Sequence, residues 1–75
     1  MNLSASQTII RDVCRDHLVH WSEVKSARQR RGRHQSARRE IAARLRALGL
    51  TTVAIGRIME RDHSTVIKSY LRKAA

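Results

Sequence analysis

The sequence has 75 residues, a length that allows one small domain with a single modest core. Sixteen lysines and arginines outnumber six acidic residues, so the formal net charge is +10, and thirteen of the sixteen cations are arginine. Because 41% of the residues are apolar, the charge does not imply disorder. A folded domain with a pI near 11.7 is typical of proteins that bind a polyanion, with nucleic acid as the first candidate.

The same composition excludes several classes of protein. The single cysteine, Cys14, excludes an internal disulfide and fits a reducing compartment, so we expect a cytoplasmic protein. No apolar run approaches the ~18 residues of a membrane span, and the first ten residues lack the features of a signal peptide. The only glycines, Gly32, Gly49 and Gly56, cannot form the common phosphate-binding glycine loops. We therefore expect no enzyme activity, no cofactor and no small-molecule substrate.

Apolar spacing predicts an all-α fold, since no segment alternates with a period of two over the length of a strand. Ser4 or Ser6 is expected to cap a first helix. Its apolar face, spaced i, i+3, i+4, i+7 and i+8, consists of Ile10, Val13, Cys14, His17 and Leu18. Ser22 is expected to cap a short second turn that carries Trp21 and Val24.

A basic loop is expected over residues 25–35, which are rich in cations and have no apolar spacing. Six arginines lie close together there and just beyond, without an intervening acid: Arg28, Arg30, Arg31, Arg33, Arg38 and Arg39. A third helix follows over about 36–48, and Gly49 is placed to end it. Its buried face is expected to consist of Ala37, Ile41, Leu45 and Leu48.

The C-terminal third predicts two short helices joined by a tight turn. Thr51 or Thr52 is expected to cap the first of them, whose apolar residues are Val53, Ile55, Ile58 and Met59. A turn at Glu60-Arg61 then leads to a last helix over about 62–73. Two short helices joined by about three residues have the dimensions of a helix-turn-helix, here over about 51–73.

The last helix divides into an apolar stripe and a polar side. The stripe consists of Val66, Ile67, Tyr70 and Leu71, and the polar side of Arg61, Thr65, Lys68 and Arg72. Asp62, His63, Ser64 and Thr65 occupy the end at which a recognition helix presents base-reading side chains, and their carboxylate, ring and hydroxyl groups suit base edges. The alternative is that Asp62 only caps a surface helix and that the cations are solvated.

The run RDHSTV over residues 61–66, preceded by Ile55-Gly56, resembles the signature of the C-terminal DNA-binding domain of the bacterial replication initiator DnaA. The similarity covers about residues 9–73. Supporting matches, in the same order along the chain, are Ile10, Val13 and His17, the segment 21–24, the arginine loop and the segment 38–42. The resemblance implies a Trp-repressor-like helical fold that binds a short asymmetric box in double-stranded DNA.

The resemblance also implies roles for individual residues. Arg31 corresponds to an arginine inserted in the minor groove, and Arg33 and Arg39 correspond to phosphate contacts. Asp62, His63 and Ser64 correspond to residues facing bases in the major groove, Thr65 to a phosphate contact, and Thr52 and Val53 to positions near thymine methyl groups. We also expect Arg28, Arg30, Arg61 and Lys68 to contribute to DNA binding.

This sequence departs from the family pattern in two connections. Met59-Glu60 stands where the family usually has Phe-Gly-Gly, so the turn is one residue shorter and places an acid beside the DNA face. The connection around Gly49 is about two residues shorter. The family's ATPase and oligomerisation domains are outside these 75 residues, which leads us to expect a monomer that controls replication initiation or regulates transcription by binding initiator-type boxes. The alternative is a decoy that holds replication proteins through its first helix and contacts DNA only loosely.

Three further features have simpler explanations. Cys14, His17 and His20 have metal-like spacing, but four convergent ligands are not evident, so we expect no metal. Trp21 is expected to pack in the core rather than to stack on bases. No helix combines a basic face with a bulky exposed apolar face, so the arginines are not expected to bind lipid.

Overall fold

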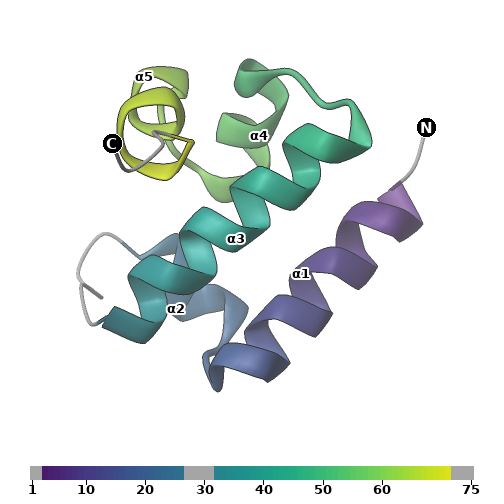
Figure 1. Ribbon diagram of the computed structural model, residues 1–75, viewed down its shortest axis with the longest axis vertical. Coiled ribbons are helices and arrows are strands. Elements are labelled where there is room, and N and C mark those ends of the chain that lie inside the picture. Colours follow the sequence, from purple (N-terminus) through teal and green to yellow (C-terminus); the bar gives the residue numbers. More distant parts are fainter. Residues whose placement is uncertain (1–2, 27–31, 72–75) are drawn as a thin grey trace.

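The computed structural model describes residues 3–26 and 32–71, and these residues form helices and short connections (Figure 1). The helices are α1 (Leu3–His17), α2 (Trp21–Lys25), α3 (Gly32–Leu48), α4 (Thr52–Met59), the single turn α5 (His63–Thr65) and its π-helical continuation η1 (Val66–Tyr70). The predicted all-α fold is confirmed.

Helix α3 is the element on which the others pack. In Figure 1 it crosses the centre of the molecule, with α1 along one side and α4 and α5 on the other. Four of its side chains, Ala37, Ile41, Ala42 and Leu45, have no exposed surface. The remaining buried apolar residues come from α1, the connection after it, α2, α4 and η1: Val13, Cys14, Val19, Val24, Ile55, Met59, Val66 and Tyr70. The buried residues therefore form a single cluster around one long helix.

Helix α3 is already helical at Gly32, four residues before the expected start. The predicted loop 25–35 is therefore too long at both ends, since Lys25 also belongs to α2. The cause is His34, which is 4% exposed and shares a face with Ile41 at helical spacing. A pattern that counts only apolar side chains therefore begins the buried face at Ala37, one turn too late.

Three helices end in the same left-handed turn, and only one of these turns uses glycine. Gly49 ends α3 with a φ of 111°, as predicted, while Leu18 after α1 and Glu60 after α4 have φ values of 57° and 56°. At each end two successive N–H groups donate to carbonyls of the last turn. Leu18 is consequently 78% exposed, so its expected place on the buried face of α1 is wrong.

The helix starts differ from the sequence prediction at two of three caps. Ser4 and Ser6 lie inside α1, and α2 begins after His20 rather than Ser22. The His20 backbone N–H donates to the Glu23 carboxylate at 3.0 Å, so an acid in the first turn replaces the expected serine. At α4 the Thr51 side chain accepts a hydrogen bond from the Ala54 N–H at 3.1 Å, which confirms the threonine cap.

The last helix does not keep a regular α-helical spacing. The Leu71 N–H donates to the Val66 carbonyl, a five-residue step that defines the π turn of η1. Val66 and Tyr70 are buried, but Ile67 is 49% exposed. The predicted apolar stripe therefore includes one residue, Ile67, that lies at the surface next to the π turn.

Leu48, at the end of α3, is 37% exposed. It lies at the edge of the buried face on which it was expected.

Gly56→Ala tests the close contact between α4 and the turn before α5. A Cβ there would lie 2.6 Å from the Arg61 carbonyl oxygen and 3.3 Å from the His63 nitrogen, both backbone atoms. We expect a loss of about 1–3 kcal/mol in the free energy of unfolding, measured by urea denaturation. Gly32→Ala is the matched control, because no atom lies within 4 Å of its Cβ position. Equal stability of the two variants would contradict the contact.

Candidate nucleic-acid interface

Helices α4 and α5 are held in a fixed relation by a three-residue turn, residues 60–62. The Arg61 N–H donates to the Gly56 carbonyl at 2.7 Å, and the absence of a side chain at Gly56 lets the two backbones approach. Ile55 and Met59 of α4 and Val66 of η1 are at most 1% exposed. These buried residues fix α4 and η1 in the core, and the start of α5 between them stays at the surface.

The first residues of α5 are at the surface. The Asp62 and His63 side chains are 69% and 54% exposed, and a carboxylate oxygen of Asp62 lies 3.4 Å from His63 Nδ1. Ser64 and Thr65 are half-buried. Asp62 occupies the N-cap position, but its side chain makes no capping hydrogen bond and only its backbone carbonyl accepts from the helix. The capping role weighed for this carboxylate is therefore absent.

The other predicted contact residues are divided among several elements. Val53, at the start of α4, is 47% exposed and its neighbour Thr52 is half-buried. Lys68 of η1 is exposed. Arg28, Arg30 and Arg31, together with Arg72, lie outside the described residues.

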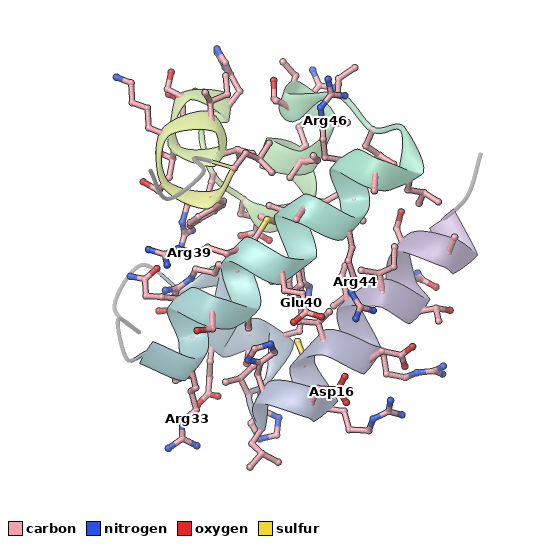
Figure 2. The ribbon with its side chains drawn as sticks, viewed as in Figure 1. Asp16, Arg33, Arg39, Glu40, Arg44 and Arg46 are labelled. Carbon is pink, nitrogen blue, oxygen red and sulfur yellow. The ribbon has the colours of Figure 1, made fainter. Side chains whose placement is uncertain are left out.

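The arginines of α3 belong to two sides of the helix. Figure 2 shows Arg39 and Arg46 on one side, and Arg33, Glu40 and Arg44 on the other, with Arg33 at the N-terminal end of α3 and Glu40 and Arg44 toward α1, where Asp16 also lies. Arg33 and Arg39 are exposed and form no ion pair with an acid of the described residues. The same holds for Arg57 of α4 and Lys68 of η1, which are also exposed.

The arginines near α1, in contrast, are engaged by acids. Glu40 accepts from Arg44 at 2.7 Å and lies 2.8 Å from the His17 ring nitrogen, while Asp12 and Asp16 pair with Arg11 and Arg15. The hydrogen bond from His17 and the charge of Arg44 hold the pKa of Glu40 below its ordinary value. This contribution to stability is complete above the ordinary pKa and is lost as the pH falls through the lowered one.

Arg38 is not available to DNA, although it stands beside Arg39 in the cationic run. Its side chain is buried, and its guanidinium donates to the carbonyls of Val24 at 2.8 Å and Ser26 at 2.7 Å, with a longer bond to Glu23. The signal that could have found it is its helical spacing from Ile41, one turn further along α3. Of the six arginines in the run, Arg38 therefore does not contribute a free surface charge.

Arg61 also makes an internal contact. Its Nη1 donates to the Lys25 carbonyl at 2.6 Å and to the Glu60 carbonyl at 3.1 Å, and the residue is half-buried. Lys25 lies 3.0 Å from the Glu60 carboxylate and 5.7 Å from the centre of the Trp21 ring. The Glu60 carboxylate of this turn is thus paired with a cation from α2.

Within residues 3–26 and 32–71, no three His, Cys, Asp or Glu side chains are grouped to hold a metal ion, and no helix is long and apolar enough to cross a membrane. Cys14 is buried, and this burial raises the pKa of its thiol. Comparisons of the chain with protein-family models, curated proteins and solved structures found no match.

Arg38→Ala is expected to destabilise the fold by about 2–3 kcal/mol, because it leaves buried carbonyls of α2 without their charged donor. The free energy of unfolding by urea measures the effect. Arg39→Ala, one residue away and exposed, is the matched control and should change this free energy by no more than about 0.5 kcal/mol. A loss at Arg39 as large as that at Arg38 would refute the division between the two arginines.

Proposed function

We propose that the chain is a sequence-specific double-stranded DNA-binding module, with α4 and α5 as a helix-turn-helix of the kind at the C-terminus of the replication initiator DnaA. One observation carries the proposal: Asp62 and His63, at the start of α5, are exposed and the Asp62 side chain makes no capping bond, while Val66 and Tyr70 anchor the following turn in the core. Such a helix presents hydrogen-bonding groups outward on a rigid support, as a recognition helix must.

In this proposal the start of α5 enters the major groove. The Asp62 carboxylate, which has no backbone hydrogen bond to give up, accepts from a cytosine amino group. The His63 ring and Ser64 hydroxyl bond to neighbouring base edges. Val53 is the exposed apolar side chain at the start of α4 and suits a thymine methyl group, with Thr52 beside it. Thr65 contacts the backbone.

The exposed cations without acid partners supply the phosphate contacts. They include Arg33, Arg39, Arg57 and Lys68 among the described residues, whereas Arg46, which is also exposed and has no acid partner, donates to the Leu50 carbonyl at 3.0 Å. Arg28 and Arg30 are proposed to add to this set, and Arg31 to enter the minor groove beside the recognition helix. Phosphate contacts fix the position of the protein, and the base contacts of α5 select the sequence. The protein is proposed to act as a monomer in the bacterial cytoplasm, in replication control or transcription regulation.

The test begins with a duplex that the wild-type protein selects from a randomised pool. His63→Ala and Ser64→Ala should reduce the affinity ratio of selected to scrambled duplex by about 5- to 100-fold, as expected for base contacts worth about 1–3 kcal/mol. Their melting temperatures should stay within a few degrees of wild type, because neither side chain belongs to the core.

Gln7→Ala on α1 is the control and should keep the full ratio, since Gln7 is exposed on a different helix. Asp62→Asn should change which base pair is preferred, because an amide presents a donor beside its acceptor. Full preference in all three α5 variants would show that this helix does not read DNA, and the decoy for replication proteins would replace the proposal.

The salt dependence of binding tests the assignment of phosphate contacts. With about 5–7 phosphates neutralised, log K should fall with log salt at a slope of about −4 to −6. Arg39→Ala should reduce the magnitude of this slope by about 0.9, and should weaken selected and scrambled duplexes alike. Arg44→Ala removes the same charge from α3, but from an arginine paired with Glu40, and should leave the slope unchanged. Equal changes in both variants would refute the assignment.

A further inference from the structure

The C-terminal end of α2 is a meeting point for two arginines that are distant in the sequence. A helix leaves its last carbonyls without intrahelical donors, and its dipole makes this end negative. Here Arg38 of α3 donates to the carbonyls of Val24 and Ser26, and Arg61 donates to that of Lys25. The carbonyls at the C-terminal end of this five-residue helix thus accept hydrogen bonds from two guanidinium groups, one from α3 and one from the turn before α5.

Arg61 donates hydrogen bonds from both its backbone and its side chain. Its N–H donates to Gly56 of α4 at 2.7 Å, and its Nη1 donates to Lys25 of α2 at 2.6 Å. Arg61 lies one residue before Asp62, whose side chain is exposed. The side chain therefore ties the entry of α5 to an element 36 residues earlier in the chain.

A second link between the same elements is weaker. Lys25 and Glu60 are 3.0 Å apart, but the Glu60 side chain is 64% exposed. Exposed ion pairs contribute little, because water and salt screen them. The Arg61 bond is part-buried and short, and a guanidinium that gave it up for a phosphate would leave a helix-end carbonyl without a donor.

We infer that Arg61 is a positioning residue for DNA recognition rather than a phosphate contact. Its guanidinium fixes the turn before α5 on the C-terminus of α2, and so sets where Asp62 and His63 stand relative to Arg33 and Arg39. Base reading requires both sets to meet one duplex at once, whereas loose phosphate binding does not. The effect on DNA recognition rests on the proposed function, whereas the contact between Arg61 and α2 is a property of the free protein.

Hydrogen exchange of the free protein tests the mechanism. Arg61→Ala should speed exchange at the amides of Ser26, Thr65 and Val66 by about tenfold, as expected when a hydrogen bond from a charged donor is lost. Amides of Ile41 and Leu45 report global unfolding and correct for any loss of stability. Arg61→Lys retains the charge and one donor, and should give smaller changes at the same amides.

Arg57→Ala is the matched control, since it removes an exposed arginine from the preceding helix and should leave all these amides at wild-type rates. Glu60→Gln should also change them little, which separates the guanidinium from the exposed pair. Wild-type exchange rates in Arg61→Ala at both the end of α2 and the start of α5 would overturn the inference.

DNA binding tests the consequence, with a duplex selected by the wild-type protein, its scrambled form and a salt titration. Arg61→Ala should lower the selected-to-scrambled affinity ratio by about tenfold while the salt slope keeps its wild-type value, and Arg61→Lys should restore part of the ratio. An unchanged ratio with a slope smaller by about 0.9 identifies a phosphate contact and overturns the inference.

The two proposals can fail separately. If the wild-type protein selects no sequence from the pool, the proposed function fails, and the exchange rates alone decide whether Arg61 couples α2 to α5. If the wild-type protein selects a sequence but Arg61→Ala keeps the full ratio, the function stands and the positioning role is overturned.

Discussion

The buried face of α3 is the constraint on which the rest of this small fold depends. Ile41 and Leu45 are fully buried, and α1, α2, α4 and η1 all pack against this one helix. A chain of 75 residues has no room for a second core, so each shorter helix is held by its contact with α3 and by hydrogen bonds at its ends. The orientation of α5 is consequently a property of the whole domain.

Several arginines among the described residues fall into three kinds, which differ in what the guanidinium contacts. Those beside α1, such as Arg44, are neutralised by acids; Arg38 and Arg61 donate to helix-end carbonyls; Arg33 and Arg39 remain exposed and without acid partners. A guanidinium suits all three uses, because it combines a fixed charge with several directed donors. The count of sixteen lysines and arginines therefore overstates the number of cations that are free to meet a polyanion.

The turn between α4 and α5 shows how the fold accommodates an unusual residue. Glu60 occupies a left-handed position that favours glycine, and it places a carboxylate near the proposed DNA face. Lys25 pairs with this carboxylate, and Arg61 bonds to the backbone on both sides of the contact. The turn is thus held to α2 by the side chains of Glu60 and Arg61.

The sequence by itself determined the all-α class, the glycine stop after α3, the threonine cap of α4 and the position of the turn before α5, because each depends on neighbours within one helical turn. It also located the polar residues at the start of α5, of which Asp62 and His63 are exposed and Ser64 and Thr65 are half-buried. Only the tertiary structure decided that His34 starts the buried face of α3, that Arg38 is internal and that Leu18 and Ile67 are at the surface. The first two outcomes depend on partners more than ten residues away, that of Leu18 on the left-handed turn that ends α1 and that of Ile67 on the π turn, and none of these is encoded in local periodicity.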